Sequence, residues 1–568
     1  MIEDVYEPLE RYVREFREKF SRLAREKFDE LASASGVDAD ANRATVAKIV
    51  RARSEAGSLR WRRNAFGVLS ALGAVAAVAA GCALASKQIP AETRETCVAV
   101  LSAGIALAAV TFPLCRRAAG RLAQVERKIA ELMAEAWTQM DPLNRLYTWD
   151  VTVRLIEATV PRLAFDPYFT AARLDSLRDE FGWDGASDGS RSVVFAQSGE
   201  INGNPFVFGQ YLKMEWDEKT YVGSREISWT EWETGPDGKR RAVRRYETLH
   251  ASVTKPVPAY SERKVLVYGN DAAPQLSFSR EPSGLRGDDG LLGRWRKGRR
   301  LKELKAFSRN LEDESQYTLM ANEEFEAWFH AKDRDDEVEF RLLFTPVAQE
   351  QMLRLMKDTT VGYGDDFSFR KARKINCLMA SHLDEAVIDT DPARFRHWDL
   401  VAAKAAFIAF NEKYFKDAYF ALAPLLSIPL YQQTRTHADI WREALGARPS
   451  SSWEHESLAN YFGERAFRHP ESVTRDILKT RVVGRDEDLC EVEVAAHGYR
   501  AVDRVDVKTV FGGDGRVHEV EVPWKEYLPV ERTSRIFLSE RSEPTEAYGR
   551  RAAAARKAVF RRSISAFI

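Results

Sequence analysis

The chain has 568 residues, 45% of them hydrophobic and 30% charged, which excludes an intrinsically disordered protein and leaves room for about two to four domains. Lysine and arginine together number 85, as do aspartate and glutamate, so no net charge favours nucleic acid and we expect no nucleic-acid partner. Five cysteines without a Cys-x-x-Cys pair argue against a disulfide framework and against a cysteine zinc site, and they favour a reducing compartment.

Residues 1–63 are predicted to form an amphipathic helical segment. Its apolar stripe, spaced as on one face of a helix, consists of Ile2, Val5, Leu9, Tyr12, Phe16, Phe20, Leu23 and Phe28.

Residues 64–116 are predicted to form a transmembrane helical hairpin. Residues 65–86 are uncharged, and a helix of that length spans about 33 Å, enough for a hydrocarbon core of roughly 30 Å. A second uncharged run, Cys97 to Cys115, follows a short polar link. The alternative is a buried hairpin of a soluble protein.

The flanking charges predict the orientation of this hairpin. Basic residues precede the first run and follow the second: Arg51, Arg53, Arg60, Arg62, Arg63, Arg116, Arg117 and Arg121. Because positive charge stays on the cytoplasmic side, we expect a multi-pass protein of the inner (plasma) membrane with both termini in the cytoplasm.

Small residues recur every four positions in the first run, at Gly73, Ala77, Gly81 and Ala85. Such a face lets helices approach closely in lipid. It suits either packing within the hairpin, which we favour, or dimerisation, and the oligomeric state stays open. Residues 117–185 are predicted to be a helical stalk or connector with too few heptads for a long coiled coil; its periodic residues are Leu122, Val125, Ile129, Leu132 and Ala136.

Residues 186–445 are predicted to be a cytoplasmic α+β domain. Two strands flank a turn at Asn202–Gly203–Asn204, a long hairpin closes at "GPDG", and "RKVLVYGN" forms another strand. Residues 322–347 are expected to form a strand, an acidic turn and a second strand before a helix. The aromatic residues Trp216, Trp229, Trp232 and Tyr246 favour cross-strand packing over base stacking.

A basic insertion at 286–305 interrupts this domain. It is either a solvated linker helix or a contact with anionic lipid. The candidate lipid contacts there are Arg294, Arg296, Lys297, Arg299 and Arg300.

The stretch "TTVGYGDD" at 359–366 matches the potassium-channel filter. A filter needs a membrane helix after it, and here "FRKARK" follows, whose basic residues would each cost about 2.5–3.5 kcal/mol at the centre of a membrane helix. We therefore predict an ordinary loop and reject the channel. The later "AYFALAPLLSIPLY" is short and contains two prolines, so it is predicted to be buried core.

Residues 446–538 are predicted to be a β-rich C-terminal module, with a helix near 454–468 and strands around the turn "GGDG". Residues 539–568 form a basic tail, predicted either to lie on the inner leaflet as an amphipathic helix or to cap the protein body. The candidate lipid contacts there are Arg550, Arg551, Arg556, Lys557, Arg561 and Arg562.

Several phrases between 190 and 435 resemble a widespread bacterial family of unknown function. They are "FEAWF" with its acidic turn, "VEFRLLFTP", "MLRLMKD", "TLHASVTKPVPAY", "VYGNDAAPQLSFSR" and "YFKDAYFALAPLLSIPLYQQ". The resemblance implies N-terminal membrane helices and a cytoplasmic α+β domain, and it supplies no catalytic residues. Residues 286–305 and those after about 445 lie outside it.

No phosphate loop, nucleophile elbow or His-Glu-x-x-His motif occurs, and the nine histidines are dispersed. We predict no catalytic, cofactor-binding or metal residues and no cofactor. The sequence favours a membrane-anchored binding or scaffold protein whose partners are the bilayer and another membrane or cytoplasmic protein. The alternatives are an enzyme of unrecognised type, with its site in 190–435, and a peripheral lipid-sensing protein.

Overall fold

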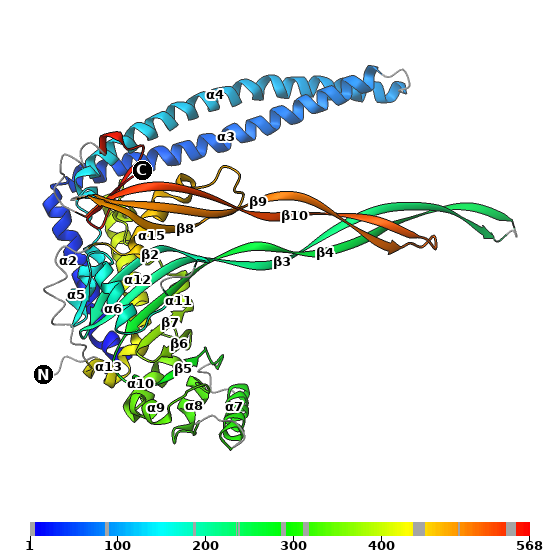
Figure 1. The fold of residues 1–568 in the computed structure, drawn as a ribbon. Helices are drawn as coiled ribbons and strands as arrows, with labels where there is room; N and C mark the ends of the chain where they lie inside the picture. Colours follow the sequence, from blue (N-terminus) through cyan, green and yellow to red (C-terminus); the bar gives the residue numbers. More distant parts are fainter. Residues whose placement is uncertain are drawn as a thin grey trace. The chain divides into compact units, whose positions relative to one another are not determined.

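A computed structural model describes residues 6–85, 90–185, 189–234, 236, 239–285, 291–309, 317–434, 449–486, 489–540 and 552–568. It combines helices with antiparallel sheets, as predicted (Figure 1). The chain forms two compact units. The helical unit consists of residues 21–148 and 391–411, and the α+β unit of residues 1–20, 149–390 and 412–568.

Two long helices dominate the helical unit: α3 (Ala39–Ala85) and α4 (Ala91–Asn144). Each contains a stretch long and apolar enough to cross a membrane. Only 11% of each stretch is buried, and Val68, Val75, Val78 and Phe112 are more than half exposed. Core helices of soluble proteins bury such residues, so these outward apolar faces fit the predicted membrane hairpin.

The two helices approach most closely at Gly73 and Gly104. A Cβ added to Gly73 would lie 2.8 Å from the Gly104 carbonyl oxygen, and one added to Gly104 would lie 2.6 Å from that of Gly73. Ala77 is half-buried in the same contact, and a Cβ on Gly81 would meet Leu101 at an ordinary 3.9 Å. Ala85 is exposed because a strict four-residue stripe drifts about 40° per step around a helix with 3.6 residues per turn.

Beyond the apolar stretches, α3 and α4 continue to pack through Ala56, Leu59 and Leu122. Arg60 pairs with Glu126 across the same interface at 2.9 Å. The predicted periodic residues Leu122 and Ala136 are buried, so the heptad-like spacing reports this helix contact.

The N-terminal apolar stripe packs on α12 (Leu400–Leu426). The chain enters through α1 (Pro8–Arg11), a π-helical turn (Tyr12–Phe16) and α2 (Arg17–Ser35). In the α+β unit, Phe20 stacks on Phe415 with ring centroids 4.3 Å apart, and in the helical unit Phe28 meets Phe407. Tyr419 and Tyr431 are fully buried, as predicted for the Pro-interrupted apolar stretch.

The α+β unit contains a seven-stranded antiparallel sheet with strand order β1-β2-β3-β4-β7-β6-β5. Its strands are β1 (Leu163–Phe165), β2 (Arg191–Ile201), β3 (Asn204–Thr234), β4 (Arg240–Gly269), β5 (Ser277–Arg280), β6 (Phe367–Ala372) and β7 (Ile375–Ala380). The predicted turn joins β2 to β3, where Asn202 and Gly203 have φ of 53° and 79°. "RKVLVYGN" is the continuation of β4 and not a separate strand, because β4 pairs with β3 over its whole length.

A second sheet has the order β11-β12-β10-β9-β8. Its strands are β8 (Ile477–Asp486), β9 (Leu489–Phe511), β10 (Val517–Ser539), β11 (Ala558–Arg561) and β12 (Ile564–Phe567). Of the two forms predicted for the tail, residues 558–567 do not form the helix; they form a hairpin that pairs with β10 and so packs on the protein body. α15 (Ser452–Phe462) packs on β2 and β8, so the C-terminal segment belongs to the same unit as the body.

The hairpins β3–β4 and β9–β10 run far beyond their sheets as long twisted ribbons (Figure 1). They touch where Ile227, Leu249 and Val520 form a small buried cluster. A Cβ on Gly223 would lie 2.0 Å from the Glu521 carbonyl oxygen, so only glycine permits this approach. Packing ribbon on ribbon supplies the stability that an isolated two-stranded hairpin lacks.

The remaining helices belong to the α+β unit. They are α5 (Val151–Thr159), α6 (Ala171–Asp179), α7 (Leu291–Arg309), α8 (Glu323–Phe329), α9 (Glu337–Leu343), α10 (Pro346–Lys357), α11 (Ser381–Glu385) and α13 (Pro429–Gln433). The strands predicted in 322–347 are helices α8 and α9, because Asn322 and Asp336 cap their first turns. Asp333 and Asp335 are exposed, and each accepts a hydrogen bond from a backbone N–H group of β5.

Candidate functional site

The "TTVGYGDD" segment is a loop between α10 and β6, as predicted. The Asp358 carboxylate accepts hydrogen bonds from the backbone N–H groups of Thr360, Val361 and Gly362, which folds the loop onto itself. Gly364 has φ of 70°, and Asp365 forms a buried ion pair with Arg280. The glycines and aspartates that resemble a filter therefore fix a tight loop turn.

The side chain of His382 on α11 is buried against this loop. Its ring stacks on Tyr363 with centroids 4.1 Å apart and an interplanar angle of 5°. Nδ1 lies 2.5 Å from the Asp366 carboxylate and Nε2 lies 3.2 Å from the Asp417 carbonyl oxygen. The Tyr363 hydroxyl donates to the Asp417 carboxylate, and burial with that contact raises the pKa of Tyr363 far above its ordinary value. Both ring nitrogens therefore lie beside oxygen atoms of the protein, which fixes the orientation of the ring.

A cavity of about 450 Å³ opens beside Asp366 and also has Asp384, Glu215, Lys213 and Arg263 on its wall. Five of the six charged side chains on its wall already have partners. Lys213 pairs with Glu215 at 2.6 Å, Arg263 with Asp384 at 3.5 Å, and Asp366 with His382. This cavity therefore offers a mixed-charge surface in which these acids are already committed to neighbouring cations.

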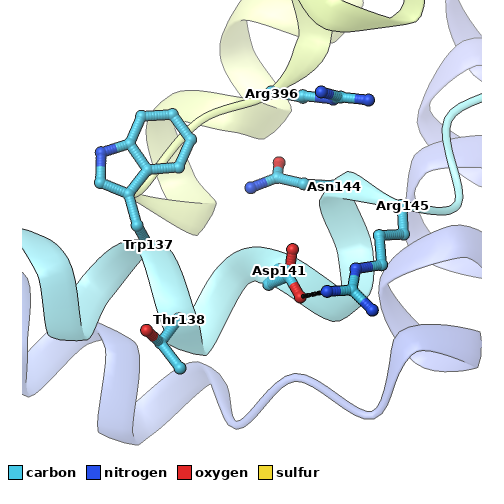
Figure 2. A pocket seen from close by; sticks show the side chains of 6 residues that line it. All are labelled: Trp137, Thr138, Asp141, Asn144, Arg145 and Arg396. Atoms are coloured by element: carbon cyan, nitrogen blue, oxygen red, sulfur yellow. Dashed lines mark ion pairs between the residues drawn. The ribbon is translucent and has the colours of Figure 1, made fainter. Parts of the chain in front are cut away.

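A second cavity, of about 520 Å³, lies in the helical unit at the C-terminal end of α4. We call it the α4 pocket; it is lined by Trp137, Thr138, Asp141, Asn144, Arg145 and Arg396. Figure 2 shows Trp137, Asn144 and Arg145 projecting from α4, and Arg396 on the segment that faces them.

Two asparagines hold the segment that carries Arg396. Asn144 on α4 donates to the His397 carbonyl oxygen and accepts from the His397 N–H, at 3.2 and 3.1 Å. Asn42 on α3 donates to the Trp398 carbonyl oxygen and accepts from the Leu400 N–H, both at 3.0 Å. The segment is thus fastened to both long helices.

The charges of the α4 pocket are unequal. Arg145 pairs with Asp141 at 2.5 Å, and both side chains are largely exposed. The Arg396 side chain is exposed, and its guanidinium has no ion-pair or hydrogen-bond partner among the described residues. Two cations and one anion give the pocket one net positive charge.

The buried side chain of Lys371 is structural. Burial lowers the pKa of Lys371 to about 7, but its amine is enclosed and donates to the carbonyl oxygens of Ala272 and Arg373. Within the described part of the chain, no group of three or more histidine, cysteine, aspartate or glutamate side chains is arranged to hold a metal ion.

The structure corrects part of the predicted lipid contacts. Arg561 and Arg562 are buried: Arg561 bonds to Ser457, and Arg562 pairs with Glu454 at 2.9 Å. These two predictions are wrong, because the guanidinium groups lie in the protein interior. Arg556 and Lys557 are exposed, and Lys557 donates to the Phe462 carbonyl oxygen.

The other candidate lipid-contact residues lie on α7 and in the tail, and their contact with lipid stays a prediction. Arg299 and Arg300 lie on α7, where Arg300 donates to the Ser283 carbonyl oxygen at 2.8 Å. Arg294, Arg296 and Lys297 lie on the same helix, but their side chains are outside the described residues, as are Arg550 and Arg551.

No protein-family model, curated protein or solved structure matches this chain. The resemblance to a bacterial family therefore stays a prediction. Sequence reasoning missed both cavities, since neither has a motif: Arg396 joins α4 from a segment more than 200 residues away. The sequence near Trp137 offers only Asp141 and Arg145 on the same helical face, a pattern too common to single out.

Proposed function

We propose that this chain is a membrane-anchored binding protein of the inner membrane, with both termini in the cytoplasm. In this proposal α3 and α4 cross the bilayer as a hairpin, the remaining protein stays on the cytoplasmic side, and the α4 pocket binds a ligand. The single observation that carries the proposal is that the apolar stretches of α3 and α4 face outward while the same helices continue into folded ends.

Three features support this reading. Apolar side chains such as Val68, Val75 and Val78 would be costly in water and favourable in lipid. Arginines flank the apolar stretches on the side of the termini, which favours a cytoplasmic location for those ends. The α4 pocket lies on the helix that contains the second stretch, so a ligand there would contact the anchoring element itself.

The enzyme alternative has no comparable support. In the cavity beside Asp366, the acids that we described are held by His382, Lys213 and Arg263. A binding role needs only the shape and charge of a pocket.

Membrane fractionation and a topology assay test the proposal. The full-length chain is expected to stay in the membrane pellet after alkaline carbonate washing. A fluorescent reporter fused after Ile568 should be bright in the cytoplasm, and a phosphatase inserted at Pro90 should be active outside. Release by carbonate, or an external C-terminal reporter, would contradict the proposed anchor.

A further inference from the structure

The α4 pocket presents one cation ready for a ligand. Arg396 is exposed and its guanidinium has no partner among the described residues, whereas Arg145 is held by Asp141. A guanidinium offers a planar fork of five N–H donors that matches the two oxygens of a carboxylate or phosphate. The net positive charge of the pocket therefore selects an anion.

The opposite side of the pocket is aromatic. Trp137 is 42% exposed, so part of its indole surface is open to the cavity (Figure 2). Thr138 already donates its hydroxyl to the Ala134 carbonyl oxygen, and the Asn144 amide is occupied by His397. The groups left for recognition are the indole face and the guanidinium, which suit a flat ring and an anion.

The pocket is also pre-organised. Asn42 and Asn144 are 1% and 6% exposed and hold the segment from His397 to Leu400 by four hydrogen bonds. Because the segment is already fixed, a ligand does not have to order it on binding, and less binding free energy is lost.

We propose that the α4 pocket binds a small anion that carries a planar aromatic ring. The carboxylate or phosphate lies against Arg396, and the ring stacks on Trp137. This inference rests on the proposed function in one respect: it names the ligand class of the site that the function uses.

The test uses the full-length chain in lipid nanodiscs with two probes, naphthalene-2-carboxylate and inorganic phosphate, titrated at low and moderate salt. The variants are R396Q, W137L and D141N. The matched control is R394Q, since Arg394 is an exposed arginine two residues away that does not line the pocket. Calorimetry gives the dissociation constant Kd of each probe.

The expected result has three parts. R396Q weakens naphthoate binding about tenfold or more, the loss typical of a charge-assisted contact, and R394Q leaves it unchanged. W137L weakens naphthoate binding about fivefold or more and leaves phosphate binding unchanged, because only naphthoate has a ring that can stack on the indole. D141N strengthens both probes, since Arg145 is released from its ion pair.

Equal effects of R396Q and R394Q would overturn the inference, as would equal effects of W137L on both probes. Absence of saturable naphthoate binding up to about 10 mM, a free energy weaker than about −3 kcal/mol, would also overturn it. Carbonate extraction of the same wild-type protein reports separately on the anchor. If carbonate releases the chain from the membrane but the chain still binds naphthoate, the proposed membrane anchor is contradicted and this inference is supported.

Discussion

At the scale of single residues, buried ion pairs link parts of the α+β unit that are far apart in the sequence. Arg562 enters from the turn between β11 and β12, donates to both oxygens of Glu454 at 2.9 and 3.0 Å, and also reaches Gln197. Glu454 is 0% exposed. Removing one partner of such a pair leaves the other charge buried without compensation.

Replacing Arg562 by alanine is therefore expected to lower the free energy of unfolding by about 3–5 kcal/mol. The double variant R562M/E454M should be less destabilised than R562A, because it removes both charges. Denaturant titration measures both. A loss under about 1 kcal/mol for R562A would mean that the C-terminal residues are not inserted as described.

His455 makes stability depend on pH. Its burial, with a smaller effect of Arg485, lowers its pKa to about 4, so the folded protein keeps it neutral where the unfolded chain binds a proton. The contribution of neutral His455 to the free energy of unfolding is complete above about pH 6.5. It is lost as the pH falls toward 4, and the loss is about 3 kcal/mol at most.

In H455Q this loss should be absent. The difference in the free energy of unfolding between H455Q and the wild type is therefore expected to change between about pH 6.5 and about pH 4. Unfolding titrations at several pH values measure it. His330, whose pKa burial also lowers to about 4, is the matched second site, and H330Q should remove a separate part of the slope. Identical pH slopes in wild type and H455Q would contradict the buried position of His455.

At the scale of elements, close backbone approaches are decided by glycine. Gly73 and Gly104 let α3 and α4 touch, and Gly223 lets the β3–β4 ribbon cross the β9–β10 ribbon. In each case a Cβ would meet backbone, which cannot rotate away as a side chain can.

The helix contact gives a matched pair of substitutions. Gly104→Ala is expected to destabilise the hairpin by about 1–3 kcal/mol through overpacking. Gly120→Ala, where nothing lies within 4 Å of the added Cβ, should be neutral or mildly stabilising, since alanine favours helix. Thermal unfolding in detergent compares the two, and equal effects would argue against the close α3–α4 contact.

At the scale of the whole molecule, apolar surface is covered in two different ways. In the α+β unit aromatic rings such as Phe20, Phe415 and Tyr419 cover one another. In the helical unit the outward faces of α3 and α4 have no protein covering among the described residues. Lipid is the solvent that accounts for the second case.

Thiol labelling distinguishes apolar surface that is buried by protein from apolar surface that is buried by lipid. Cys82 is exposed on α3 within the apolar stretch, and Cys490 is buried in a protein core. In native membranes both are expected to resist a water-soluble maleimide. Detergent alone should make Cys82 reactive, and only unfolding should expose Cys490. Fast labelling of Cys82 in intact membranes would contradict a lipid-covered α3; single-cysteine variants provide the measurement.

Local patterns were sufficient to predict much of this protein. The uncharged runs predicted α3 and α4, and alternating residues around "GPDG" and "GGDG" predicted two long hairpins, because neighbouring residues alone determine such signals. They failed in 322–347, where capping by Asn322 and Asp336 outweighed the β-like composition. At the tail, spaced charges left a lipid-bound helix and a cap on the protein body equally open, and strand pairing with β10 decided between them.

By itself the sequence determined the two apolar helices, the strand hairpins and the loop nature of "TTVGYGDD", since each depends on residues close in the chain. Tertiary structure alone decided that Arg562 meets Glu454, that His382 lies between Asp366 and Asp417, and that Arg396 and Trp137 line one pocket. These contacts join residues that are far apart in sequence. Their formation depends on how whole elements pack, which no local spacing encodes.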